Sequence, residues 1–181
     1  MVAGLWVFGY GSLIWNPGFV VAESHVARLA GWQRSFCMRS IHYRGTVAQP
    51  GLVLALDRAD GALCDGLALR VAAGFEAEAL AGLRARELIS RAYLEQRLAV
   101  DLRAGGRVEA VAYVIDPEHD QYCGALTLEQ QAGIIARAQG ARGSNRDYLL
   151  ATADHLARLG IRDADLAWLA ARVRALAGPG A

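Results

Sequence analysis

The chain contains no lysine, so all 19 of its basic side chains are arginines. This absence excludes a phosphate-binding loop of the GxxxxGK[ST] type, in which the lysine reaches the phosphates. The chain also has almost no excess of charge of either sign, because its formal net charge is only +1. The composition therefore gives no reason to expect nucleic acid or an acidic membrane surface as a partner.

Cysteine is scarce, and Cys37, Cys64 and Cys123 are far apart without a CxxC pair. This pattern argues against a disulfide framework and favours the reducing cytoplasm as location. The four histidines show no metal-ligand spacing either, so we predict no metal site.

Long apolar runs are missing as well. No stretch approaches the roughly 20 residues that a membrane-spanning helix needs, and residues 5–8 are too short for the core of a signal peptide. We therefore expect no leader and no membrane partner. The 181 residues are 54% hydrophobic and 20% charged, which predicts one globular domain over residues 1–181.

The first two-thirds of the chain is typical of β-strands. We predict strands at residues 5–9, 32–39, 51–56, 63–71, around 98–102 and at 108–115, with turns at 57–61 and at Gly105-Gly106. Residues 51–56 and 63–71 are expected to form a hairpin. Trp32, Phe36 and Trp168 are expected in the core.

Helices are predicted at residues 74–89, 127–139, 144–159 and from Asp163 onward. Thr127 and Gln130 fit a capping box, Ser144 and Asp163 fit N-caps, and Gly160 fits the position after a helix end. The sequence therefore predicts an α+β fold, a curled or closed mixed sheet of about six strands with peripheral helices.

The segment Gly9-Tyr10-Gly11-Ser12 follows the first apolar strand. Two glycines permit a sharp bend, and successive amides in such a bend can bind a carboxylate, a phosphate or an oxyanion. An ordinary turn is the alternative. Position 14 is isoleucine, so the third glycine of the dinucleotide fingerprint is absent, and GxSxG is absent too.

Glu87 continues the spacing of Leu80 and Leu83 along the predicted helix. Its carboxylate would then lie beside the apolar stripe, where partial desolvation favours proton uptake and suits a general base. The alternative is a surface ion pair with Arg84 or Arg91.

Four polar residues are candidates for the wall of a pocket: Arg44, Tyr122, Asn145 and Tyr148. A simple loop explains the segment 42–45 equally well. For Tyr148, a buried position on its helix is the alternative.

Taken together, these motifs resemble the ChaC family of glutathione-specific γ-glutamylcyclotransferases. The opening VFGYGSLIWNPGF at residues 7–19 is similar to the family's signature, and Arg86-Glu87 followed by Tyr93-Leu94 resembles its RE segment. Further matches follow in order along the chain, at residues 31–39, 44–46, 49–51, 66–70, 143–149 and 159–161.

The resemblance implies the γ-glutamylcyclotransferase-like fold, a small mixed β-barrel with peripheral helices. It also implies cleavage of glutathione to 5-oxoproline and Cys-Gly without a cofactor. It implies Glu87 as the catalytic acid–base group. It also implies that a loop holds the γ-glutamyl group through its backbone, formed by Val7, Phe8, Gly9, Tyr10, Gly11, Ser12 and Leu13.

One segment departs from the family pattern. The family usually has glycine between the RE segment and the tyrosine, where this chain has Ser90-Arg91-Ala92. Two alternatives stay open: turnover of other γ-glutamyl amino acids or amines, and a non-catalytic module that binds γ-glutamyl ligands. The oligomeric state does not follow from the sequence.

Overall fold

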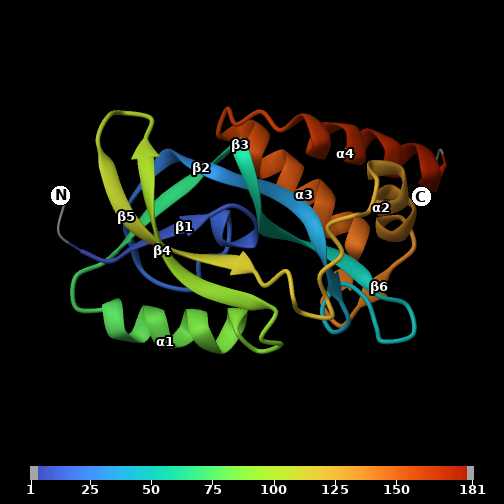
Figure 1. Cartoon of the computed structure of the whole chain (residues 1–181), viewed down its shortest axis with the longest axis horizontal. Helices are drawn as coiled ribbons and strands as arrows, with labels where there is room; N and C mark the ends of the chain where they lie inside the picture. Colours follow the sequence, from blue (N-terminus) through green and yellow to red (C-terminus); the bar gives the residue numbers. More distant parts are fainter. Residues whose placement is uncertain (1–3, 179–181) are drawn as a thin grey trace. The chain divides into compact units, whose positions relative to one another are not determined.

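The structure is a computed structural model that describes residues 4–178 (Figure 1). Its internal contacts divide the chain into two compact units. The first comprises the described residues up to 35 together with 55–120, and the second comprises 36–54 with the described residues from 121 onward.

Five strands form a closed mixed barrel in the order β1-β3-β2-β4-β5. They are β1 (Trp6–Gly9), β2 (Val21–Ser40), β3 (Gly51–Val71), β4 (Tyr93–Leu102) and β5 (Arg107–Ile115). Strand β1 is antiparallel to β3 and parallel to β5, with Val7 opposite both Leu69 and Val111. Gly105 and Gly106, both at positive φ, turn β4 into β5. The predicted α+β barrel with peripheral helices is confirmed.

The predicted hairpin between residues 51–56 and 63–71 is wrong. The two segments belong to the single strand β3, which is 21 residues long. The turn-forming residues 57–61 do not reverse the chain, although Gly61 has a φ of +78°. A glycine at positive φ inside a strand is typical of a local bend or bulge, and it leaves the strand direction intact.

Strand β2 begins at Val21, well before the predicted start at residue 32. Its first half carries Glu23 and His25 at half-buried positions. These polar groups interrupt the apolar alternation that marks a strand. They are nevertheless satisfied, because His25 lies 3.1 Å from Glu23 and Arg70 pairs with the same carboxylate.

Helix α1 (Glu76–Glu87) lies in the first unit and runs alongside the barrel strands (Figure 1). Its buried Ala79 and Leu83 join a core cluster with Leu13 and Tyr113. Ala79 and Leu83 therefore dock the helix on this cluster. The same four-residue spacing places Glu87 one turn later, at the end of the helix.

The second unit contains the helices α2 (Leu128–Ile135), α3 (Asn145–Arg158) and α4 (Ala164–Ala177), with α4 packed on the other two. The predicted caps are confirmed: Thr127 forms the capping box with Gln130, and Ser144 and Asp163 accept amide hydrogen bonds. Helix α2 ends at Ile135, short of the predicted residue 139, and the short strands β6 (Gln139–Gly140) and β7 (Gly143–Ser144) follow it.

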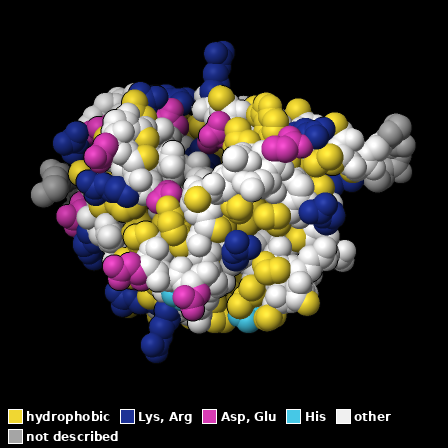
Figure 2. Space-filling model, turned by 45° about the vertical axis from the view of Figure 1, so that its right-hand side comes forward, with side chains coloured by type: hydrophobic (Ala, Val, Ile, Leu, Met, Phe, Trp, Pro, Cys, Tyr) yellow, Lys and Arg dark blue, Asp and Glu magenta, His cyan; other side chains and the backbone are white. Residues whose placement is uncertain are grey.

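Trp32 and Phe36 are buried as predicted, whereas Trp168 is 41% exposed and not in the core. Arginine and acidic side chains are interspersed on the face shown in Figure 2. No helix within residues 4–178 has the length and apolar character that crossing a membrane requires.

Candidate functional site

The glycine bend forms a compact turn at the end of β1. After Gly9 the chain enters the short 3-10 helix η1 (Ser12–Ile14), in which the Ile14 amide donates to the Gly11 carbonyl at 3.0 Å. A Cβ atom on Gly9 would lie 3.3 Å from the Leu13 Cβ. Glycine therefore allows the turn to fold back closely onto its own strand.

Most side chains of residues 7–13 face the interior. Val7 and Phe8 are fully buried, and Tyr10 and Leu13 are nearly so. The Tyr10 hydroxyl donates to the Tyr113 carbonyl at 2.8 Å, and the Tyr10 carbonyl accepts from Arg34 Nε at 2.6 Å. A ligand at this loop would therefore meet backbone groups and Ser12.

Glu87 is the last residue of α1, one turn beyond the buried Leu83. Its side chain is 17% exposed, which agrees with the predicted place beside the apolar stripe. Its carboxylate lies 3.0 Å from Arg86 Nε. Arg84, one of the two partners considered from the sequence, holds Glu95 instead through two bonds of 2.8 and 2.7 Å.

Arg86 connects Glu87 to the glycine bend. One terminal nitrogen donates to Ser12 Oγ at 2.6 Å, and the other donates to the Asn16 carbonyl at 2.7 Å. The structure thus brings together two segments that are at least 70 positions apart in the sequence. From the sequence, Arg86 was identified only as part of the RE segment and was assigned no role, although its place directly before Glu87 was a usable signal.

Tyr113 and Glu95 form a second polar pair that the sequence did not reveal. They stand opposite each other on β5 and β4, and the Tyr113 hydroxyl donates to Glu95 at 3.1 Å. Burial, followed by the negative charges of Glu95 and Glu87, raises the pKa of Tyr113 far above its usual value. The phenol therefore stays protonated and remains a donor.

Three predicted pocket-wall residues, Arg44, Asn145 and Tyr148, lie together in the second unit. The Arg44 guanidinium is 5.4 Å from the centre of the Tyr148 ring. The fully buried Asn145 side chain accepts from the Leu52 amide at 2.6 Å and donates to the Leu52 carbonyl at 2.7 Å. Tyr148 is buried on its helix, as the alternative reading of its position expected. Tyr122 pairs with Met38 in an isolated antiparallel β-bridge.

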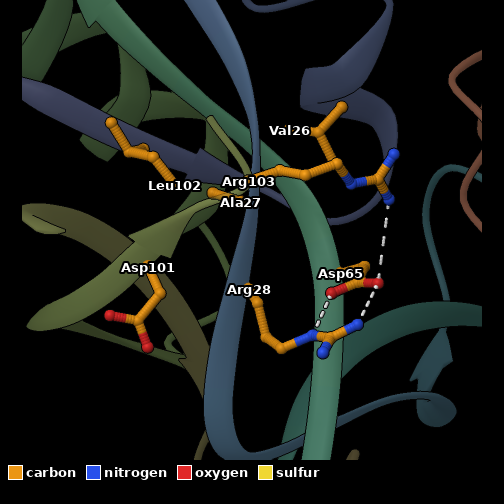
Figure 3. Close-up of a pocket in the computed structure, with 7 residues that line it drawn as sticks. All are labelled: Val26, Ala27, Arg28, Asp65, Asp101, Leu102 and Arg103. Atoms are coloured by element: carbon orange, nitrogen blue, oxygen red, sulfur yellow. Dashed lines mark hydrogen bonds and ion pairs between the residues drawn. The ribbon is translucent and has the colours of Figure 1, made fainter. Parts of the chain in front are cut away.

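A surface pocket of about 230 Å³ lies elsewhere in the first unit (Figure 3). Asp65 sits there between Arg28, at 2.7 Å, and Arg103, at 4.0 Å. The Arg28 hydrogen bond holds the pKa of Asp65 below its usual value. None of the predicted site residues is among its lining residues, which are Val26, Ala27, Arg28, Asp65, Asp101, Leu102 and Arg103.

Metal-binding side chains are not gathered in the described part of the chain. Within residues 4–178, no group of three or more His, Cys, Asp or Glu side chains is placed to hold a metal ion.

Comparison with solved structures defines the fold class. A γ-glutamyl cyclotransferase specific to glutathione from yeast superposes with a TM-score of 0.86, covering 96% of this chain and 97% of the yeast chain at 23% identity. The fold is therefore that of the γ-glutamyl cyclotransferases.

Sequence comparison then identifies the family. The ChaC-like protein family model matches residues 5–176, and this chain belongs to that family. The glutathione-specific γ-glutamylcyclotransferase of Escherichia coli strain K12 is 38% identical over 95% of this chain and 74% of its own length. The glutathione-specific γ-glutamylcyclotransferase 1 of Danio rerio is 35% identical over 91% of this chain and 86% of its own length.

Proposed function

We propose that this protein is a γ-glutamylcyclotransferase that cleaves glutathione to 5-oxoproline and Cys-Gly, with Glu87 as the acid–base group. One observation carries the chemistry: Arg86 bonds both the Glu87 carboxylate and Ser12 of the glycine bend. A proton carrier and a backbone loop thus adjoin within one unit. The names of the 35–38% identical relatives support glutathione as the substrate.

The reaction is an intramolecular aminolysis. The α-amine of the γ-glutamyl group attacks its own γ-carbonyl carbon, so a C–N bond of the five-membered lactam forms. The amide C–N bond to cysteine then breaks, and Cys-Gly leaves as an amine. Nucleophile and electrophile belong to one molecule, so the step needs no water and no cofactor.

Glu87 supplies the proton transfers in this scheme. An α-amino group has a pKa of about 8, so it is mostly protonated at neutral pH and cannot attack. The Glu87 carboxylate takes its proton and returns one to the leaving amide nitrogen. Such general acid–base help contributes about 10²–10⁴-fold to the rate.

The loop of residues 7–13 holds the γ-glutamyl group in the proposed complex. The hydrogen bonds of the turn begin at the Ile14 amide, and the first N–H groups of a helical turn have no partner within it. The Ser12 and Leu13 amides are therefore suited to receive the oxyanion of the tetrahedral intermediate. Loss of one such donor costs about 3–4 kcal/mol in other enzymes.

Two further assignments belong to this proposal. Cys37, Cys64 and Cys123 are buried thiols, which supports a reducing cytoplasmic location. The assignment of Arg44, Tyr122, Asn145 and Tyr148 to a pocket wall stays a prediction, as does the single domain over residues 1–181.

The test is to incubate the purified protein with glutathione and to quantify 5-oxoproline and Cys-Gly. We expect both products in equal amounts, together with lower turnover of γ-Glu-Ala and of a γ-glutamylamine. Faster turnover of γ-Glu-Ala than of glutathione would show that γ-glutamyl amino acids, and not glutathione, are the preferred substrates. Binding of glutathione without either product would establish the non-catalytic module and overturn the proposal.

A further inference from the structure

The Arg86 side chain makes three contacts with three separate groups. It donates to Ser12 Oγ at 2.6 Å and to the Asn16 carbonyl at 2.7 Å, and its Nε lies 3.0 Å from the Glu87 carboxylate. Two of these partners belong to the turn after β1, and the third ends α1. The guanidinium is therefore a fixed spacer between turn and helix.

The contact between Arg86 and Glu87 is not a by-product of helical geometry. Adjacent helical side chains point in different directions and do not normally face each other. Here Glu87 is the last helical residue, and Leu88 caps the helix. The Arg86 side chain must turn toward its neighbour to reach it, and the two contacts with the turn fix it in that direction.

The chemistry of arginine suits this task. A guanidinium presents five N–H donors in a rigid plane, so it can hold several acceptors in one arrangement. The Arg86 side chain is only 21% exposed. A lysine would offer a compact point charge on a flexible stem, which can satisfy one partner well but not this set.

We propose that Arg86 is a positioning residue, which fixes the Glu87 carboxylate at a set distance from the Ser12 turn. The inference rests on the proposed function, because it assigns the residue that aligns the proton carrier with the loop that binds substrate. Alignment matters because a displacement of about 1 Å at a reacting group can cost about 10²-fold in rate.

The test uses Arg86→Gln, Arg86→Lys, Ser12→Ala and the double variant of Arg86→Gln with Ser12→Ala. We expect Arg86→Gln to lower kcat by about 10–100-fold, with a smaller change in KM, and Arg86→Lys to recover part of the loss. Ser12→Ala should have a milder effect. The double variant should be no slower than Arg86→Gln alone, because the serine hydroxyl acts through Arg86.

Arg97→Gln is the matched control, since Arg97 is a 58% exposed arginine of the same unit, paired with Glu109 at 3.5 Å. It should leave kcat unchanged. Thermal unfolding of every variant verifies the fold, and Ser12→Ala keeps the test decisive if Arg86→Gln fails to fold. Unchanged kcat in Arg86→Gln, additive losses in the double variant, or a rise in KM alone would overturn the positioning role.

A second readout does not depend on turnover. Hydrogen exchange of the Ile14–Asn16 amides should accelerate in Arg86→Gln and stay unchanged in Arg97→Gln. If the wild-type protein forms no 5-oxoproline, the proposed function fails, and this exchange result still reports whether Arg86 holds the turn. Unchanged exchange in Arg86→Gln would show that it does not.

Discussion

Tyr113 stands directly opposite Glu95 across the β4–β5 pair, and its hydroxyl donates a 3.1 Å hydrogen bond to that carboxylate. Arg84 of α1 holds both oxygens of the same carboxylate. The trio therefore joins helix α1 to the barrel wall near the end that carries Glu87.

This arrangement predicts a loss of stability in acid. The Arg84 hydrogen bond, together with the bond from Tyr113 and the nearby positive charges, outweighs burial and lowers the pKa of Glu95. A depressed folded-state pKa stabilises the fold above the unfolded value of about 4.3, and this contribution is lost as pH falls through the folded value. Urea unfolding at pH 7 and pH 3 should show a smaller stability difference for Glu95→Gln than for the wild type.

Glu118→Gln provides the control for that experiment, because Glu118 is exposed on a loop of the same unit. It should keep the wild-type difference between pH 7 and pH 3. An equal difference in Glu95→Gln and wild type would contradict the stabilising role of the trio.

Glu87→Gln is expected to lower turnover strongly while preserving the fold. The amide has nearly the same shape but cannot accept a proton from the substrate ammonium, so kcat should fall by about 10²–10⁴-fold. Steady-state kinetics on glutathione and thermal unfolding measure the two effects separately. Glu109→Gln, at a 57% exposed carboxylate, is the matched control and should retain full activity. Near wild-type kcat in Glu87→Gln would remove its catalytic assignment.

Local signals predicted the helices of the second unit well. Thr127 with Gln130, Ser144 and Asp163 each satisfy orphan amides of the first turn, and this chemistry is complete within four residues. The long strands were harder, because Glu23 and His25 break the apolar alternation of β2 and are satisfied by each other and by Arg70. Only the three-dimensional partner makes such a pattern compatible with a strand.

The candidate site shows the same division. The spacing from Leu83 to Glu87 placed the carboxylate beside the stripe, because helical periodicity is a local property. The contacts of Arg86 with Ser12 and of Tyr113 with Glu95 depend on how separate elements pack, and no periodicity encodes them. Asn145 illustrates a further limit: a buried amide that bonds backbone and one that faces a ligand look alike in a sequence.

Arg91 offers a test of backbone strain in the segment that departs from the family pattern. Its φ of +58° is the only positive value among the non-glycine residues that the structure describes. This conformation costs a non-glycine residue roughly 1–2 kcal/mol. Replacement by glycine removes that cost, but it lowers stability by about 0.4–1 kcal/mol because glycine increases the conformational entropy of the unfolded chain. Arg91→Gly should therefore raise the free energy of unfolding by about 0.5–1 kcal/mol.

Arg91→Ala separates strain from the loss of the side chain, because alanine keeps the cost of positive φ. Urea denaturation of both variants should rank glycine above alanine and wild type. A glycine variant no more stable than the alanine variant would show that the segment relaxes out of this conformation.

Asn145→Ala is expected to lower the free energy of unfolding more than any of the substitutions above. The side chain is fully buried and satisfies both the amide and the carbonyl of Leu52, so its removal leaves two buried backbone groups without these bonds. Each such group costs about 1–3 kcal/mol, which gives a total loss of about 2–6 kcal/mol in the free energy of unfolding.

Gln139→Ala, at an exposed amide of the same unit, is the control and should change stability by less than about 0.5 kcal/mol. Chemical denaturation measures both variants, and kcat and KM are then determined at a temperature where each is folded. If Asn145 serves only the backbone of β3, the folded Asn145→Ala protein keeps the wild-type KM. A raised KM in the folded variant, with little loss of stability, would return Asn145 to the pocket wall that its sequence position suggested.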